Sequence, residues 1–563
     1  MKSRNRREAR SRRRVGSEAG RPRPADAGAA AGEGAPAAAA PTPGDLPRSA
    51  GVPAGVPSDL LFLAAAVGIL LVAAALRLPL LDLNPFHHDE GINGFFTTNL
   101  LRNGVYTYDP ANYHGPSLYY FALASATLFG LTTEAMRLVP VLAGLATVAL
   151  VFPLRRFIGP LAALTAAALL AVSPGAVYVS RYFIHESLLV CFTLALVVST
   201  LLYLDRRRPQ YLLAAAASAA LMFTTKETGI IAVAVLLIAA VLTRYYLGLR
   251  VPAATRNGPR RTARKAGSMY VDGVEYRPVT APRSRVEPEH LAGAAIVFLA
   301  IYVLLYSSFF TNYPKGLVDS LATFTVWTQT GAATQVQPIQ TYVVWMLRAD
   351  GPILVLGTVG GLIAALKGRD RVAVFIGLWT LGITAAYSLI QYKTPWIALN
   401  MLVPLALLAG IAIREATQSD RRRRVAPVAL AGAILLSGYQ AVDLNFRHYD
   451  DETYPYVFVH TTREALALVD RIEQTASKAG TGRETGITFV TPDYWPLPWY
   501  MRDYPQAIFH GKVVETDEPM IVANVNQEAE LAQFATGYTR AGTYHLRPGV
   551  DLALYVRNDL AGP

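Results

Sequence analysis

The sequence predicts an all-α polytopic membrane protein that carries a small α/β domain at its C-terminal end. Hydrophobic residues make up 52% of the 563 positions and charged residues only 16%, which is typical of membrane proteins and not of soluble enzymes. Apolar runs recur between residues 60 and 442, and most approach the ~20 residues that cross a bilayer. After residue 443 polar and apolar residues alternate, as in a soluble domain.

The first segment, residues 1–58, is rich in Arg and then in Ala, Pro and Gly, and it contains no aromatic residue. Such a composition cannot bury a core, so we expect a disordered basic tail. The apolar run that follows is long enough to fill a bilayer, which favours a retained first helix over a cleaved secretory signal.

The predicted transmembrane domain, residues 59–442, has about eleven crossings. The apolar runs that predict them are 60–81, 137–154, 161–179, 187–204, 211–225, 229–247, 291–310, 352–366, 371–390, 396–413 and 426–442.

Positive charge predicts the orientation, because cytoplasmic loops of membrane proteins are enriched in Lys and Arg. With the basic tail in the cytoplasm, eleven crossings also place every later basic cluster there: 155–156, 206–208, 244–285, 367–371 and 421–424. The apolar run 118–131 would reverse this pattern if it crossed, so we interpret it as a juxtamembrane or re-entrant helix. We therefore expect a multi-pass protein of the plasma (inner, cytoplasmic) membrane with a large outer loop at 82–136 and a basic cytoplasmic loop at 248–290.

The last segment, residues 443–563, is predicted to be an extracytoplasmic α/β domain. A helix is expected over 460–477, because Ala465, Leu468, Val469, Ile472 and Ala476 share one face. Short strands are expected at 486–491, 520–524 and 551–556, separated by Pro, Gly and Asp turns.

Polar side chains that carry chemistry gather on the predicted outer face. The stretch 85–91, PFHHDEG, follows the first crossing, and His114 lies further along the same loop. Further groups follow in later outer turns: Arg181, His185, Glu186, Lys226, Glu227, Tyr392 and Lys393. Ionisable residues around a bilayer are functional candidates by default. A carboxylate could take the proton of an attacking acceptor hydroxyl, and Arg or Lys could stabilise a departing phosphate. A lipid-phosphate donor would explain a site at the membrane surface.

Several of these stretches together resemble motifs of the GT-C integral-membrane glycosyltransferases, which include the protein O-mannosyltransferases and the aminoarabinose transferases. The stretches are HDEG at 88–91, HGPSLYY at 114–120 and SRYFIHESL at 180–188, with Arg137 and Leu138 at the start of the second crossing. TKETG at 225–229, KTPW at 393–396 and WPLPWY at 495–500 are most similar to the bacterial and archaeal family described as flippase-activity-associated and mannosyltransferase-like.

The resemblance implies an inverting hexosyltransferase that moves a sugar from a polyprenyl-phosphate donor to an extracytoplasmic acceptor hydroxyl. Asp89 matches the position of the general base, and Glu90 would orient the acceptor. His114, Arg181, His185, Glu186, Lys226, Glu227, Tyr392 and Lys393 are the expected substrate-binding residues. Some relatives use a divalent metal ion, for which His88 and Asp89 are candidate ligands.

Other interpretations remain open at this stage. Asp89 and Glu90 could cap a helix in a solvated loop, and Arg181 and Lys393 could be cations that extend from helix ends toward water. The alternative function is a lipid-linked sugar flippase or an accessory protein that binds the same headgroup without catalysis. The net charge of +12 lies in short clusters between apolar runs, so it predicts membrane topology and lipid contact and no nucleic-acid binding.

Overall fold

The computed structural model describes residues 58–112, 114–249, 269–271, 274–276, 286–330, 336–368 and 370–560. The predicted disordered tail therefore lies outside the described residues, apart from Ser58. Of the basic loop expected at 248–290, the described part contains two short paired strands, β1 (Met269–Val271) and β2 (Val274–Tyr276), and the ends of the flanking helices.

The chain is a multi-pass membrane protein. Among the described residues, eight helical segments are long and apolar enough to cross a membrane, or ten when each of two bent helix pairs is one span. The predicted span at 211–225 is a shorter apolar helix of 15 residues. In chain order, the helices at the predicted spans are α1 (Ser58–Arg77), α4 (Thr133–Val151), α6 (Pro160–Val172) with α7 (Pro174–Ser180), α8 (Glu186–Arg206), α9 (Pro209–Phe223), α10 (Gly229–Leu249), α11 (Pro288–Tyr306), α13 (Thr341–Ala349) with α14 (Gly351–Lys367), α15 (Arg371–Leu389), α16 (Leu399–Thr417) and α18 (Val425–Val442).

The two bent pairs have local causes. Helix α6 gives way to α7 at an angle of 61°, where Pro174 occupies the first turn of α7 and the Ser173 hydroxyl accepts the Ala176 N–H. Helix α13 meets α14 at 117° around Asp350. A missing N–H and a capping side chain end one helix and begin the next at little cost. The Ser173 hydroxyl also donates to the buried Asp350 carboxylate at 2.5 Å, which ties the two bends together.

Helix α16 lies at the centre of the bundle and is buried along most of its length. Glycines let α14 approach it closely: a Cβ atom at Gly357 or Gly360 would lie 2.6 or 2.0 Å from a carbonyl oxygen of α16. Small residues at such interfaces are typical of membrane helices. Helices at the periphery instead expose large apolar side chains, such as Leu71 (65%), Leu237 (63%) and Leu435 (73%), as expected of surfaces that face lipid.

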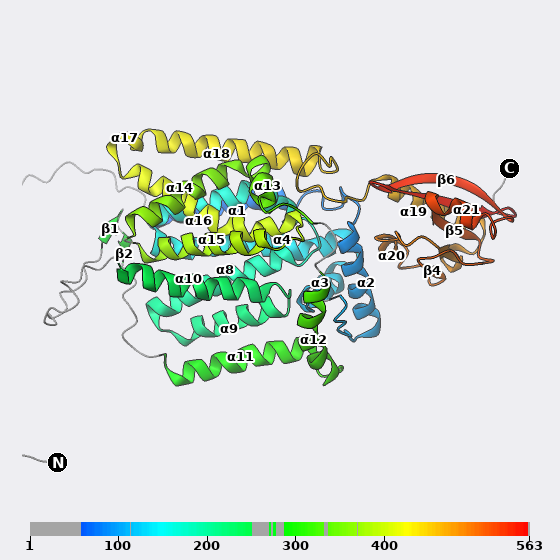
Figure 1. Ribbon diagram of the computed structural model, residues 1–563, viewed down its shortest axis with the longest axis horizontal. Coiled ribbons are helices and arrows are strands. Elements are labelled where there is room, and N and C mark those ends of the chain that lie inside the picture. Colours follow the sequence, from blue (N-terminus) through cyan, green and yellow to red (C-terminus); the bar gives the residue numbers. More distant parts are fainter. Residues whose placement is uncertain are drawn as a thin grey trace, which may run out of the picture. The chain divides into compact units, whose positions relative to one another are not determined.

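Three further helices, α2 (His88–Asn103), α3 (Ser117–Phe129) and α12 (Lys315–Thr330), gather at one end of the long helices (Figure 1). Helix α3 is the apolar helix expected at 118–131, and α2 contains the sequence HDEG. Two small helices connect membrane helices at turns: α5 (Arg155–Ile158) and α17 (Asp420–Arg423).

The C-terminal segment folds into a small sheet domain. Its helix α19 (Glu464–Lys478) buries the face that the sequence predicts. Three of its strands, β3 (Ile487–Phe489), β5 (Met520–Asn524) and β7 (Val550–Arg557), lie at the predicted positions, whereas β4 (Ala507–Phe509) and β6 (Tyr538–Arg547) were not predicted. The sheet order is β4-β3-β5-β7-β6, with parallel pairing at β4-β3-β5 and antiparallel pairing elsewhere.

Two short helices complete this domain, α20 (Leu497–Tyr500) and α21 (Glu528–Leu531).

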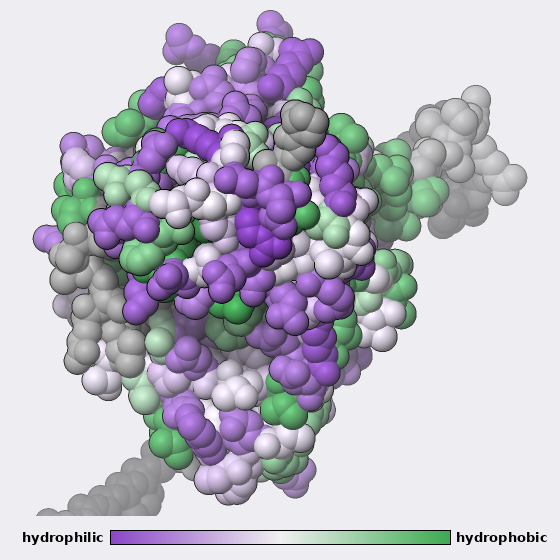
Figure 2. Space-filling view, turned by 90° about the vertical axis from the view of Figure 1, so that its right-hand side faces the viewer, coloured by the Kyte–Doolittle hydropathy of each residue, from purple (hydrophilic) through white to green (hydrophobic). Residues whose placement is uncertain are grey.

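The face of the molecule in Figure 2 is largely hydrophilic, with scattered hydrophobic residues. Such a surface is suited to water and not to the hydrocarbon interior of a membrane.

Candidate active site

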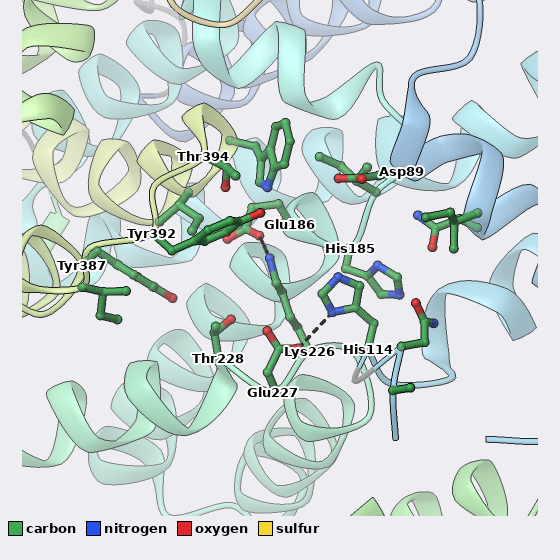
Figure 3. Close-up of a pocket in the computed structure, with 18 residues that line it drawn as sticks. Asp89, His114, His185, Glu186, Lys226, Glu227, Thr228, Tyr387, Tyr392 and Thr394 are labelled. Carbon is green, nitrogen blue, oxygen red and sulfur yellow. Dashed lines mark hydrogen bonds and ion pairs between the residues drawn. The ribbon is translucent and has the colours of Figure 1, made fainter. Parts of the chain in front are cut away.

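A cavity of about 530 Å³ opens among residues that the sequence places far apart. Seven of the predicted site residues line it: Asp89, His114, His185, Glu186, Lys226, Glu227 and Tyr392. Figure 3 shows Glu186 and Lys226 between two groups, with Asp89, His114 and His185 on one side and Tyr387, Tyr392 and Thr394 on the other. Cavities of this size accommodate drug-sized ligands.

Asp89 lies in the first turn of α2 and is half-buried at the cavity wall. The turn is held by His87, which is the N-cap residue. Its Nδ1 atom accepts the Asp89 N–H at 3.1 Å, while Glu90 accepts the His87 N–H at 2.9 Å. This reciprocal capping box fixes the backbone under Asp89 and leaves its carboxylate facing the cavity.

Lys226 lies in the turn between α9 and α10, and its Nζ atom is 2.7 Å from a carboxylate oxygen of Glu186. The Asn400 side-chain amide donates to the other carboxylate oxygen. Burial alone would lower the pKa of Lys226, but attraction from Glu186 and Glu227 outweighs it and holds that pKa above its ordinary value. The lysine is therefore charged and fixed in the cavity wall.

The turn that carries Lys226 is joined to the segment before α3 by backbone hydrogen bonds. The Gly115 and Ser117 N–H groups donate to the carbonyls of Thr225 and Thr224 at 3.0 and 2.8 Å. A Cβ atom at Gly115 would lie 2.2 Å from the Thr224 carbonyl oxygen, so only glycine allows this approach. The pairing explains why the sequences HGPS and TKET meet.

His114 and Glu227 form a second pair at the cavity, with 2.9 Å between Nδ1 and the carboxylate. Burial would raise the pKa of Glu227, but the attraction of His114 and its hydrogen bond hold it below the ordinary value. The centre of the His185 ring lies 4.6 Å from that of the His114 ring, with the ring planes tilted by 46°, and burial holds the pKa of His185 well below its usual range. The Nε2 atom of His185 is buried without a protein partner and so is available to a ligand in the cavity it lines.

Glu90 does not line the cavity but is completely buried beside Asp89. Its carboxylate receives two hydrogen bonds from Arg137, at 2.7 and 2.6 Å, and one from the Phe183 N–H at 2.7 Å. Arg137 also donates to backbone carbonyls of the segment that precedes α2. The buried pair thus joins α2 to α4 and to the loop before α8.

Arg181 and Lys393 also lie outside the residues that line the cavity. The Arg181 guanidinium donates to three backbone carbonyls just after α1, at 2.7 to 3.1 Å, and packs over the Phe446 ring. The Lys393 ammonium donates to the carbonyls of Ser388 and Ile390 at the end of α15. Both cations therefore bind backbone carbonyls at helix ends, where carbonyls lack partners within the helix.

His88 and Asp89, the candidate metal ligands, have no third ligand beside them in the part of the chain that the structure describes. No three His, Cys, Asp or Glu side chains lie together there in a way that could hold an ion. His88 packs instead against Trp495, and burial lowers the pKa of His88 to about 4. We therefore assign no step to a metal.

Several lining residues were missed by sequence reasoning as site residues, among them Asn93, Thr228, Tyr387, Thr394 and Trp396. Thr228, Thr394 and Trp396 lie in the motifs TKETG and KTPW but were not singled out within them, whereas Asn93 and Tyr387 lie in helices with no distinguishing pattern. Asn400, which holds Glu186, is also new, and the signal for it was available: it is one polar amide at the start of the apolar run 396–413. Of the residues that line the cavity, Asp89, Glu186 and Glu227 are carboxylates and Lys226 is a lysine, so acidic groups outnumber it.

Comparison with known proteins agrees with this architecture. The family model for dolichyl-phosphate-mannose-protein mannosyltransferases matches residues 113–254, which carry five of the ionisable cavity side chains just described: His114, His185, Glu186, Lys226 and Glu227. No curated protein matches the sequence closely enough to add to this comparison.

Solved structures show the same fold over most of the chain. ArnT from Cupriavidus metallidurans, bound to undecaprenyl phosphate, is 16% identical, with a TM-score of 0.63 over 90% of this chain and 99% of its own. The Archaeoglobus fulgidus oligosaccharyltransferase, in complex with Zn and sulfate, is 14% identical, with a TM-score of 0.52 over 88% of this chain and 75% of its own. The chain therefore has the fold of the GT-C superfamily of membrane glycosyltransferases.

Proposed function

We propose that the protein is an inverting glycosyltransferase that moves a hexosyl group from a polyprenyl-phosphate donor to an acceptor hydroxyl. The observation that carries this proposal is the cavity that brings a half-buried carboxylate, Asp89, together with a fixed cation, Lys226. Direct displacement needs a base on one side of the sugar and charge stabilisation at the phosphate on the other.

In the proposed reaction the acceptor oxygen attacks the anomeric carbon as the bond from that carbon to the phosphate oxygen breaks. Asp89 takes the proton of the acceptor hydroxyl, and the polyprenyl phosphate leaves with the bonding electron pair. Lys226 stabilises the negative charge on the departing phosphate, and Glu186 and Asn400 hold the lysine in place. A single displacement of this kind inverts the anomeric centre.

Among the three cations that the sequence offered as phosphate partners, the geometry favours Lys226. Arg181 and Lys393 are occupied by backbone carbonyls, whereas Lys226 lines the cavity. His185 and Thr394 add buried polar atoms without protein partners on opposite sides of the cavity. Sugar hydroxyls are suited to these atoms, because an unsatisfied buried polar group costs about 1–3 kcal/mol that a ligand can recover.

The structural neighbours support the lipid carrier and a separate acceptor molecule. ArnT was solved with undecaprenyl phosphate, and the archaeal oligosaccharyltransferase was also solved with a tethered acceptor peptide. We extend to this chain a polyprenyl-phosphate sugar as donor and an extracytoplasmic acceptor. The basic clusters support an orientation with the N-terminus in the cytoplasm and the cavity and C-terminal domain outside.

Transfer by purified protein in liposomes tests the proposal. A panel of radiolabelled polyprenyl-phosphate hexoses is offered with candidate acceptors, and Asp89→Asn is compared with the wild type. We expect transfer by the wild type and a loss of about 10²–10⁴-fold in kcat in the variant, the usual contribution of a general base.

Ile92→Val serves as a lining control, because it changes an apolar cavity side chain and removes neither a charge nor a hydrogen bond. Undiminished transfer by Asp89→Asn would refute the assignment of the base. Binding and crossing of the labelled carrier by the wild type, with no sugar transferred to any acceptor in the panel, would support the flippase alternative.

A further inference from the structure

The catalytic helix α2 is packed against the C-terminal domain through two glycines one turn apart. A Cβ atom at Gly91 would lie 2.6 Å from the Cβ of Pro496, and one at Gly94 would lie 2.6 Å from the Trp499 ring. Glycine inside a helix costs about 0.5–1 kcal/mol relative to alanine. Close approach of α20 offsets this cost, and it explains the glycines that follow Asp89 and Glu90.

Phe86, directly before α2, is held by the same short helix of the C-terminal domain. Its ring stacks on Trp499 with 4.6 Å between centroids, and its N–H donates to the Tyr500 hydroxyl at 2.8 Å. Phe86 and Trp499 are both almost completely buried. The start of α2 is therefore fixed by residues more than 400 positions later in the chain.

His87 receives a second contact, from the segment that leads to the C-terminal domain. Because its Nδ1 atom accepts the Asp89 N–H, its proton is on Nε2, which donates to the Phe458 carbonyl at 3.1 Å. The next residue, Val459, has a φ of 49°, which is unusual for a β-branched residue and indicates backbone held by its surroundings.

We propose that the C-terminal domain positions the catalytic helix: Trp499, Tyr500 and the Phe458 carbonyl hold residues 86 and 87 so that Asp89 faces the cavity. This inference rests on the proposed function of Asp89 as the base. The C-terminal domain would thus act in turnover without touching the donor. Helix α20 contacts α2 at Gly91 and Gly94, close to Asp89, and among the described residues none of α20 lines the cavity.

The test compares Tyr500→Phe with Tyr504→Phe in full-length protein reconstituted in liposomes. Tyr500→Phe keeps the ring and removes the oxygen that accepts the Phe86 N–H, whereas Tyr504→Phe removes a hydroxyl from the core of the same domain. We expect kcat to fall about tenfold in Tyr500→Phe, with KM for the donor unchanged within about twofold, and neither constant to change in Tyr504→Phe.

Hydrogen–deuterium exchange gives a readout that does not depend on transfer. Amides in residues 86–92 should exchange about tenfold faster in Tyr500→Phe than in Tyr504→Phe, while exchange in β3, β5 and β7 stays the same. Exchange and kcat that both match the control would overturn the positioning role.

The two proposals fail separately. Faster exchange at residues 86–92 without any transfer by the wild type would support the contact and refute the proposed function. A rise in the donor KM at unchanged kcat would instead make Tyr500 part of donor binding and would overturn the inference.

Discussion

The buried pair of Glu90 and Arg137 offers the sharpest test of how the site is built. Substituting Glu90→Gln keeps the shape of the side chain but removes its charge. The guanidinium of Arg137 is then left buried without its counter-ion, in a position where both partners are almost fully shielded from water.

The magnitude follows from the contacts. The Glu90 carboxylate accepts four hydrogen bonds, two from Arg137 and one each from the N–H groups of His87 and Phe183, all between 2.6 and 2.9 Å. Removing one partner of a buried ion pair destabilises proteins by about 3–5 kcal/mol. We expect a loss of this size in the free energy of unfolding, measured by titrating protein in bicelles with sodium dodecyl sulfate.

The matched control is Glu528→Gln, which removes the same charge from the exposed pair with Arg540. Surface pairs contribute about 0–1 kcal/mol, so this variant should unfold almost like the wild type. Combining Glu90→Gln with Arg137→Met should cost at least about 2 kcal/mol less than the sum of the single losses, because the double variant leaves no unpaired charge. Additive losses, or a Glu90→Gln variant as stable as its control, would refute the reasoning.

Three further predictions concern charge and pH. Lys226→Gln should lower kcat/KM for the lipid-linked donor about 10²-fold in the liposome assay, because it removes the proposed stabilisation of the phosphate. In the same assay Lys393→Gln should change kcat/KM far less, since the Lys393 ammonium binds backbone carbonyls. Equal losses of kcat/KM in the two variants would contradict the assignment of Lys226 as the phosphate partner. Burial lowers the pKa of His460 from 6.5 to about 3, so the unfolded chain binds a proton that the folded chain excludes. Stability should therefore be complete above about pH 6.5 and decline by up to about 1.4 kcal/mol per pH unit below it, and unfolding of His460→Gln across this pH range should show a smaller decline.

Periodicity and length predicted most of the membrane domain, because an apolar run of ~20 residues has few alternatives to a membrane helix. The sequence also predicted that Asp89, Glu186 and Lys226 lie near one another, because each lies beside an apolar run at its predicted outer end. Strands β4 and β6 were missed, since β4 is a short apolar run between polar residues, whereas β3 lies in the longer run 486–491, and β6 includes a register shift near Gly542. Neither gives a clear alternating pattern.

Side-chain direction was the part that sequence could not supply. Arg181 and Lys226 are both cations in turns that the sequence predicts to be outer, yet one binds the backbone near the end of α1 and the other lines the cavity. A rotation of about one residue along a helix end decides between these outcomes, and no local pattern encodes it. The role of Glu90 was hidden for the same reason, because its partner Arg137 lies 47 positions away.

The hydrogen bond between Phe86 and Tyr500 also has a consequence for biosynthesis. Its two residues are separated by 414 positions, so at about 5–20 residues per second the ribosome needs about 20–80 s to deliver the second after the first. Throughout that interval the nascent chain can insert its first helices while the segment bearing Asp89 still lacks this support. On this view the chain completes its site only after residue 500 has been synthesised, so products terminated before that residue would reach the bilayer without an assembled site.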